Sequence, residues 1–84
     1  MTNEKITELK EENYNNALDD IFVEIETYLI DHDMRLSAFY DVIDEYHTNH
    51  YKIKTRKTNP TIKRIARIAA GMNKKLRLSF VDPL

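Results

Sequence analysis

The sequence predicts a small, mostly α-helical domain of four or five helices that ends in one β-strand. Three observations support this fold class. Apolar residues recur at steps of three and four through much of the chain, the only glycine follows such a stretch, and a two-residue alternation appears only after it. The length of 84 residues suits one domain, and 42% hydrophobic with 32% charged residues fits a folded protein.

The first long helix is expected from Ala17 to about Asp31. Residues 1–16 are polar and lack a clear apolar stripe, so we expect a flexible arm there, followed by the domain over residues 17–84. Asn15 or Asn16 would cap this helix. Its buried face would consist of residues at helical spacing: Leu18, Ile21, Phe22, Ile25 and Leu29.

Two shorter helices are expected next. Ser37 would cap a helix that runs to about Tyr46, and Thr48 or Asn49 would cap another that ends near Lys54. The apolar side of the first would be formed by Phe39, either Val42 or Ile43, and Tyr46. Tyr46 is therefore expected in the core.

The strongest start signal for a helix is Asn59-Pro60. Asparagine caps well, and proline at the first helical position loses no needed hydrogen bond. A buried stripe would follow at Ile62, Ile65, Ile68 and Ala69, with outward side chains at Lys63, Arg64 and Arg67. Gly71 would end this helix in the left-handed conformation that glycine adopts without strain.

After Gly71 the period changes from 3.6 to 2, which predicts a strand over about 75–81 with Pro83 as its stop. A lone strand cannot satisfy its backbone hydrogen bonds. We therefore expect it to pair with a second copy or with a partner protein, although an unrecognised extended piece of this chain is a further alternative. The pairing residues would be Leu76, Arg77, Leu78, Ser79 and Phe80.

The formal net charge of −1 hides a strong asymmetry between the two parts of the chain. Residues 1–51 hold thirteen acidic and three basic side chains, whereas residues 52–84 hold ten basic side chains and one acidic one. No acidic residue occurs from Lys52 to Arg77. This favours a polyanionic partner for the basic part, while the alternative is that the two parts fold against each other. The two interpretations can coexist.

Several function classes find no support in the sequence. The chain has no cysteine, no glycine-rich phosphate loop and no motif that sets a nucleophile beside a base, so we expect no enzyme, no catalytic residue and no cofactor. His47 and His50 could join Asp44 or Glu45 around a metal, but no second cluster completes the ligands, so no metal is expected. Without an apolar span or signal peptide, we expect a cytoplasmic protein with no membrane partner.

The order of two short helices, a basic segment, Asn-Pro, a helix and glycine resembles the Cro and Xre class of helix-turn-helix proteins. The stretch 59–72 carries most of the resemblance, and residues 75–81 are similar to the C-terminal strand of small antitoxins of the host-inhibition-of-growth class. Lys54 and Arg56 depart from the family pattern of glutamate and glycine, and the usual glycine near residues 44–47 is missing. Arginine in a left-handed turn costs roughly 1 kcal/mol relative to glycine, so we expect this loop to have another shape.

The resemblance implies that the third helix enters the major groove of double-stranded DNA. Base contacts would come from Asn49, His50 and Lys52, with the role of Tyr51 left open between base or sugar stacking and the core. Phosphate contacts would come from Thr48, Lys54, Thr55, Arg56, Lys57 and Lys63. The alternative for these basic residues is an exposed, solvated face.

Two functions follow from these patterns. The first is a sequence-specific DNA-binding transcriptional regulator, an autoregulating antitoxin or phage-type repressor, acting as a homodimer with a possible toxin or other protein partner. The alternative is a protein–protein interaction module of phage or mobile-element origin, an inhibitor or adaptor built on a helix-turn-helix scaffold. The acidic first helix and the missing turn glycines motivate this alternative.

Overall fold

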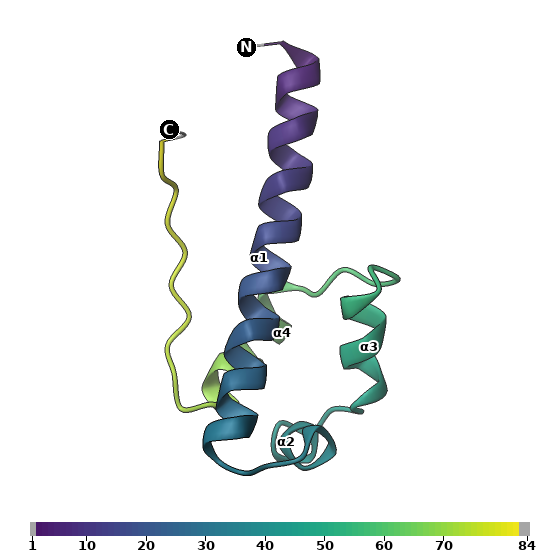
Figure 1. Ribbon diagram of the computed structural model, residues 1–84, viewed down its shortest axis with the longest axis vertical. Helices are drawn as coiled ribbons and strands as arrows, with labels where there is room; N and C mark the ends of the chain where they lie inside the picture. The colour runs from purple at the N-terminus through teal and green to yellow at the C-terminus, as the bar shows by residue number, and fades with distance from the viewer. Residues whose placement is uncertain (1, 83–84) are drawn as a thin grey trace.

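The computed structural model describes residues 2–82, which form four α-helices and an extended C-terminal segment (Figure 1). The helices are α1 (Asn3–Asp31), α2 (Leu36–Val42), α3 (Thr48–Lys54) and α4 (Ile62–Gly71). The predicted mostly helical class is thereby confirmed. Residues 2–82 contain neither a β-strand nor a fifth helix, so these two details of the expected fold find no support.

The first helix begins much earlier than its apolar pattern indicates. Thr2 caps it, because its hydroxyl oxygen accepts a hydrogen bond from the backbone N–H of Lys5 at 3.2 Å. Asn15 and Asn16 therefore lie inside the helix and do not cap it. Most side chains of residues 2–16 are exposed, so this part of the helix needs no apolar stripe, and its glutamate, lysine and leucine residues still favour a helix. The predicted flexibility of residues 1–16 stays a prediction.

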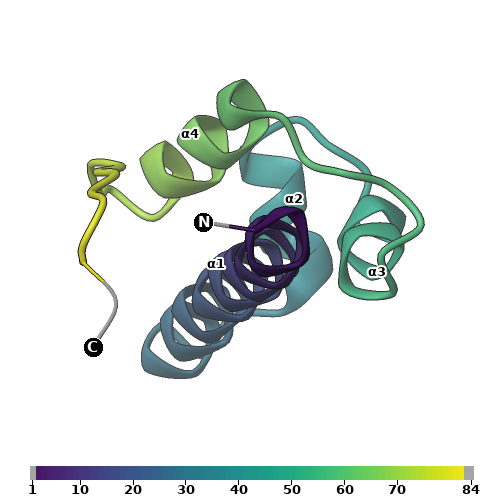
Figure 2. The same ribbon diagram turned by 90° about the horizontal axis from the view of Figure 1, so that it is seen from above.

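The three short helices pack around the C-terminal half of α1, while its N-terminal turns project beyond them (Figures 1 and 2). A 29-residue helix is about 43 Å long at 1.5 Å per residue. This length accounts for the elongated shape of the molecule, which measures 45 × 24 × 21 Å. None of the helices within residues 2–82 is long and apolar enough to cross a membrane.

Two clusters of buried side chains form the core. The larger one joins α1, α2, α4 and the residue after α4, and it consists of Ile25, Phe39, Tyr40, Ile43, Ile68 and Met72. The smaller one fixes α3 against α1 and consists of Leu18, Phe22 and Ile53. Of the expected face of α1, Leu18, Phe22 and Ile25 are buried, and Ile21 and Leu29 pack beside them.

The apolar side of α2 differs from the predicted one. Because α2 ends at Val42, Tyr46 falls in the following turn and is 81% exposed, so its expected core role is wrong. Tyr40 fills the core in its place, next to Phe39. Of the two alternatives at the end of the helix, Ile43 is buried and Val42 is exposed.

Each helix is followed by a residue in the left-handed conformation, and none of these residues is glycine. The residues with φ between 47° and 63° are Asp33, Asp44, Arg56 and Asn73. After each of them, the next backbone N–H reaches back to a carbonyl in the last turn of the helix. These hydrogen bonds are Met34 to Leu29 (2.9 Å), Glu45 to Tyr40 (2.9 Å), Lys57 to Lys52 (2.8 Å) and Lys74 to Ala69 (2.9 Å). This is the Schellman ending, built here without glycine.

Gly71 does not end α4 in the left-handed conformation, which corrects the prediction. It is the last residue of the helix, and Asn73 adopts the positive φ instead. A Cβ atom at Gly71 would collide with the Cγ2 atom of Ile43 and would lie 3.4 Å from the ring of Phe39. Glycine is therefore needed here for close packing of α4 against α2.

The fourth helix begins at Ile62 and not at Pro60. The Thr61 hydroxyl accepts a hydrogen bond from the backbone N–H of Arg64 at 3.1 Å and so acts as the cap. The side chain of Asn59, the predicted cap, instead accepts a hydrogen bond from the Tyr14 hydroxyl at 2.6 Å. Ile62 consequently lies in the first turn and is exposed rather than part of the buried stripe.

The C-terminal segment runs away from α4 without pairing as a strand (Figure 1). The expected strand residues Leu76, Arg77, Leu78, Ser79 and Phe80 therefore form no strand within the described chain. Alternation of apolar and polar residues defines two faces, but a strand also needs a neighbour that accepts its backbone hydrogen bonds. The expected stop at Pro83 lies outside the described residues.

Candidate nucleic-acid interface

Helix α3 lies at the edge of the molecule, on the side opposite the C-terminal segment (Figure 2). Its range agrees with the prediction, since it runs from Thr48 to Lys54. One side is buried through His50 and Ile53, while Thr48, Tyr51 and Lys52 are exposed and Asn49 is half-buried. We call Thr48, Asn49, Tyr51 and Lys52 the α3 surface. Tyr51 belongs to this surface and not to the core, because it is 56% exposed.

His50 is the clearest correction among the predicted base-contacting residues. It is only 4% exposed, and its ring makes edge contacts with Phe22, Tyr40 and Tyr51 at centroid distances of 5.1, 5.7 and 5.4 Å. Its Nδ1 atom hydrogen bonds with the Tyr40 hydroxyl at 3.1 Å. Burial, followed by the nearby Lys54 ammonium, lowers the pKa of His50 below 6.5. A buried ring in this position anchors α3 and cannot reach a base.

Three of the expected phosphate-contacting residues are engaged within the protein. The Lys54 Nζ atom lies 3.3 Å from a carboxylate oxygen of Glu26. The Thr55 hydroxyl donates to the Tyr51 carbonyl at 2.8 Å. The Arg56 guanidinium donates to Asn15 at 3.2 Å and to Asp19 at 3.3 Å, both on α1. Lys54 and Arg56 thus link the end of α3 to the first helix, whereas the bond of Thr55 stays at the end of α3 itself.

The conformation of Arg56 shows that the loop after α3 does not have the different shape expected from the sequence. Its φ is 63°, so the loop keeps the left-handed conformation although the residue is arginine. A further hydrogen bond runs from its guanidinium to the Lys54 carbonyl at 2.9 Å. The contacts to the Asn15 and Asp19 side chains offset part of the roughly 1 kcal/mol that a side chain costs in this conformation.

The remaining predicted residues fall into two groups. Lys52 and Lys57 are neighbours, since the Lys57 N–H donates to the Lys52 carbonyl at 2.8 Å. Lys63 lies in the first turn of α4, and no hydrogen bond or ion pair within residues 2–82 joins it to α3. None of these three lysines forms an ion pair with another described residue, so their charges stay available at the surface.

An ion pair between a buried carboxylate and a half-buried arginine braces the turn between α2 and α3. A Glu45 carboxylate oxygen lies 2.8 Å from Nε of Arg64 in α4, and the Glu45 side chain is only 6% exposed. Its second oxygen, Oε2, is buried and has no hydrogen-bond partner among the described residues. Burial, followed by the Glu45 charge, raises the pKa of Tyr40 to about 12. The sequence did not reveal this pair, because helical periodicity directed Arg64 outward.

Ion pairs also link the acidic and basic parts of the chain, as the alternative interpretation of the charge asymmetry proposed. They are Lys54–Glu26, Arg56–Asp19, Arg64–Glu45 and Lys74–Glu24. The other basic residues of the second part form no ion pair within residues 2–82: Lys52, Lys57, Lys63, Arg67, Lys75 and Arg77. The two parts therefore fold against each other and still leave unpaired cations.

Within the described residues, no group of three or more histidine or acidic side chains is arranged to hold a metal ion. Comparison with known proteins gives no guide to the family, because no family model, curated protein or solved structure matches this chain significantly.

Proposed function

We propose that this protein is a sequence-specific DNA-binding regulator that inserts α3 into the major groove. The observation that carries the proposal is the α3 surface itself. It lies on a short helix that is anchored from behind by His50 and Ile53, and it follows α2 after a tight turn. A helix of this kind can present its side chains to base edges while neighbouring groups contact phosphates.

The charges around α3 support this proposal. Two acidic side chains of α1, Glu26 and Asp19, form ion pairs with Lys54 at the end of α3 and with Arg56 after it. Lys52 and Lys57 have no such partners within residues 2–82. The positive charges of Lys52 and Lys57 are therefore not neutralised by an ion pair, although the whole chain carries a formal charge of −1.

The proposed contacts with DNA are of two kinds, to base edges and to phosphates. Asn49 and Lys52 would contact base edges, since an amide pairs with adenine and an ammonium group with guanine. Thr48, Lys57 and Lys63 would contact phosphates, and Tyr51 would pack against a sugar or base. His50, Lys54, Thr55 and Arg56 would support the helix from behind instead of touching DNA.

The test is a titration of the protein into DNA from immediately upstream of its own gene, with scrambled DNA as control, at several salt concentrations. A specific site should bind at least ~10³-fold tighter than scrambled DNA, and the affinity should fall steeply with salt. Preference for the upstream fragment would support autoregulation, as expected of an antitoxin or phage-type repressor. Equal binding to both fragments would contradict sequence-specific regulation.

The variant Lys52→Ala should weaken specific binding by about 10-fold to 100-fold, corresponding to about 1–3 kcal/mol for a base contact. Lys10→Ala is the matched control, because Lys10 is an exposed lysine near the distal end of α1. Affinity measured by fluorescence anisotropy should change little in the control. Equal losses in the two variants would show that net charge, and not the α3 surface, governs binding.

The second candidate is a protein–protein interaction module on the same scaffold. It is favoured by one observation, namely that Lys54, Thr55 and Arg56 already make contacts within the protein, so three of the expected DNA contacts are lost. A folded protein that binds no DNA even at low salt would support this candidate. Affinity capture with the folded protein would then be the next experiment.

A further inference from the structure

Helix α3 packs outside the larger buried cluster. Of its seven residues, His50 and Ile53 are buried. Ile53 joins the smaller cluster with Leu18 and Phe22, whereas the larger cluster contains no residue of α3 among residues 2–82. Regions with few buried contacts open at a lower free energy than the core, so α3 can separate while α1, α2 and α4 stay packed.

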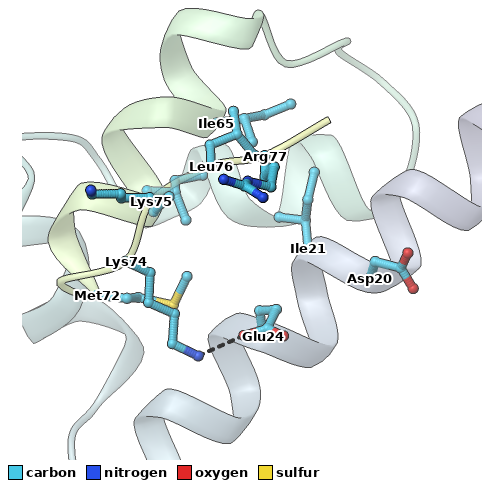
Figure 3. Close-up of a pocket in the computed structure, with 11 residues that line it drawn as sticks. Asp20, Ile21, Glu24, Ile65, Met72, Lys74, Lys75, Leu76 and Arg77 are labelled. Carbon is cyan, nitrogen blue, oxygen red and sulfur yellow. Dashed lines mark hydrogen bonds and ion pairs between the residues drawn. The ribbon is translucent and has the colours of Figure 1, made fainter. Parts of the chain in front are cut away.

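Helix α4 is fixed to α1 independently of α3. Ile68 of α4 and Met72 after it belong to the larger cluster, and Lys74 pairs with Glu24 of α1 at 2.8 Å (Figure 3). A groove of about 380 Å³ lies on this side of α1, and within the described chain no residue of α3 lines it. A loss of contacts at α3 would therefore leave the packing of α4 unchanged.

His50 is the polar member of the contacts that hold α3. Its ring is 4% exposed and lies against Phe22 of α1 and Tyr40 of α2, with Tyr51 of α3 beside it. Its Nδ1 atom hydrogen bonds with the Tyr40 hydroxyl at 3.1 Å, which links α3 to a residue of the larger cluster. A protonated ring would place a charge in this water-poor site, whereas the same ring on a released α3 would be hydrated.

The charged side chains near His50 do not favour a proton on balance. Burial is the largest cause that lowers the pKa of His50, and the Lys54 ammonium is the second. Glu26 of α1 acts in the opposite direction, but its carboxylate already lies 3.3 Å from the Lys54 ammonium. The pKa of His50 therefore lies below its ordinary value of 6.5.

On the α2 side, the Tyr40 hydroxyl is the titratable group that faces His50. Burial, followed by the Glu45 charge, raises the pKa of Tyr40 to about 12, while Arg64 acts in the opposite direction. Tyr40 therefore stays neutral near pH 7, and His50 is the member of this pair that changes its charge.

We propose that His50 makes the position of α3 sensitive to pH, because its protonation releases α3 from α1 and α2 while the larger cluster stays packed. A helix of seven residues is not stable alone in water, so release also unfolds it. The regulation rests on the proposed function, since release takes the α3 surface out of position for the major groove. Acid then weakens DNA binding. An exposed histidine beside DNA would have the opposite effect, because its added positive charge strengthens binding to phosphates.

The size of the effect follows from the two protonation equilibria. On a released α3, His50 has its ordinary pKa of 6.5. Between pH 7.5 and pH 5.5, protonation then favours the released form by up to about tenfold over the anchored form. The effect begins as the pH falls through 6.5 and is complete at the lower pKa of the anchored ring.

Hydrogen exchange of the protein alone measures the release without DNA. Each backbone amide rate at pH 7.5 and pH 5.5 is divided into the rate of an unstructured peptide at the same pH, which gives a protection factor. We expect α3 to be less protected than α4 at both pH values, and its protection to fall by up to about tenfold at pH 5.5. Equal protection in α3 and α4 would show that α3 opens only with the whole domain, and this would overturn the proposal.

The variant His50→Gln should remove the effect of pH on α3, because its amide can still hydrogen bond with Tyr40 but does not titrate. His47→Gln is the matched control, since His47 is an exposed histidine at the N-cap of α3 and should not alter the effect. If His50→Gln loosens α3 at both pH values, the double variant Tyr40→Phe and His50→Phe replaces both hydrogen-bonding partners with apolar rings and provides the same comparison. A pH effect that persists without His50 would contradict the proposal.

DNA affinity at the two pH values tests the regulatory consequence. Apparent affinity is proportional to the fraction of chains with α3 in place. The ratio of the Kd at pH 5.5 to the Kd at pH 7.5 should therefore be up to about tenfold larger in the wild type than in His50→Gln. Equal ratios would overturn the regulation and leave the proposed function intact. Release of α3 in a protein that binds no DNA at either pH would contradict the proposed function and leave the release established.

Discussion

His50 illustrates how one residue can be polar in sequence and structural in function. Its ring lies among Phe22, Tyr40 and Tyr51, and its hydrogen bond with Tyr40 satisfies a polar atom that would be costly to bury alone. Because burial disfavours the protonated ring, the folded state holds His50 neutral at pH values where an exposed histidine begins to protonate.

This environment predicts that stability falls as the pH is lowered through 6.5. The pKa of His50 is lower in the folded than in the unfolded chain, so the unfolded chain takes up the proton first. The stabilising effect is complete above pH 6.5 and is lost as the pH falls toward the folded pKa. Between pH 7.5 and pH 5.5, the free energy of unfolding measured with urea should fall more in the wild type than in His50→Gln. An equal loss in both proteins would exclude His50 as the cause.

Gly71→Ala should lower the free energy of unfolding, although alanine favours a helix by about 1 kcal/mol over glycine. The added Cβ would collide with Ile43, and overpacking of a core typically costs about 1–3 kcal/mol. The collision should therefore outweigh the gain in propensity. Urea denaturation of the variant measures the balance. A more stable variant would mean that α4 shifts away from α2 at little cost.

At the scale of elements, the short helices depend on their ends and on packing. Seven residues, the length of α2 and of α3, are too few for a helix to be stable alone in water. α3 is held by Ile53 and His50 on its inner side and by the Schellman ending at Arg56. The ion pair between the buried Glu45 carboxylate and Arg64 then fixes the turn before α3 to α4.

The cap of α4 gives a direct test at this scale. Thr61→Ala should destabilise the protein by about 1 kcal/mol, because the hydroxyl that accepts from the Arg64 N–H is removed. Pro60→Ala should change stability less, because Pro60 precedes the helix and contributes no cap. Thermal unfolding of both variants provides the comparison. If Pro60→Ala were destabilised more than Thr61→Ala, Pro60 and not Thr61 would mark the start of the helix.

For the whole molecule, α1 serves as the support on which the other elements assemble. Its C-terminal half contributes to both buried clusters, whereas the residues before Tyr14 are in neither and project beyond the other helices (Figure 1). The ion pairs from α1 to Lys54, Arg56 and Lys74 are largely exposed. Exposed pairs contribute about 0–1 kcal/mol each, so apolar packing and not charge holds the two parts together.

Deletion of residues 1–10 should therefore leave the fold intact. We expect the free energy of unfolding to change by about 1 kcal/mol or less, mainly through loss of the Thr2 cap, because none of residues 2–10 is in a buried cluster. The helical signal in circular dichroism should fall only by the share of the deleted turns. Loss of cooperative unfolding would show that the projecting part of α1 is needed for the fold.

The sequence by itself determined the helical class, the inner face of α1 and the range of α3, because each depends on local periodicity and composition. Leu18, Phe22 and Ile25 could be recognised as core residues since only one face of a helix can be buried. Local patterns also revealed the separation of charge, but they could not show which charges would be paired.

Only the tertiary structure decided which polar residues are internal. The His50 ring is buried by Phe22 of α1 and Tyr40 of α2, and the Glu45 side chain is buried where it pairs with Arg64 of α4. These partners lie elsewhere in the chain, so the residues next to His50 and Glu45 in the sequence do not reveal the burial. The same reason applies to Gly71, whose role is set by Ile43 and Phe39 on another helix. The C-terminal segment shows the limit most clearly, since alternation marks two faces but a strand forms only where a second strand supplies the hydrogen bonds.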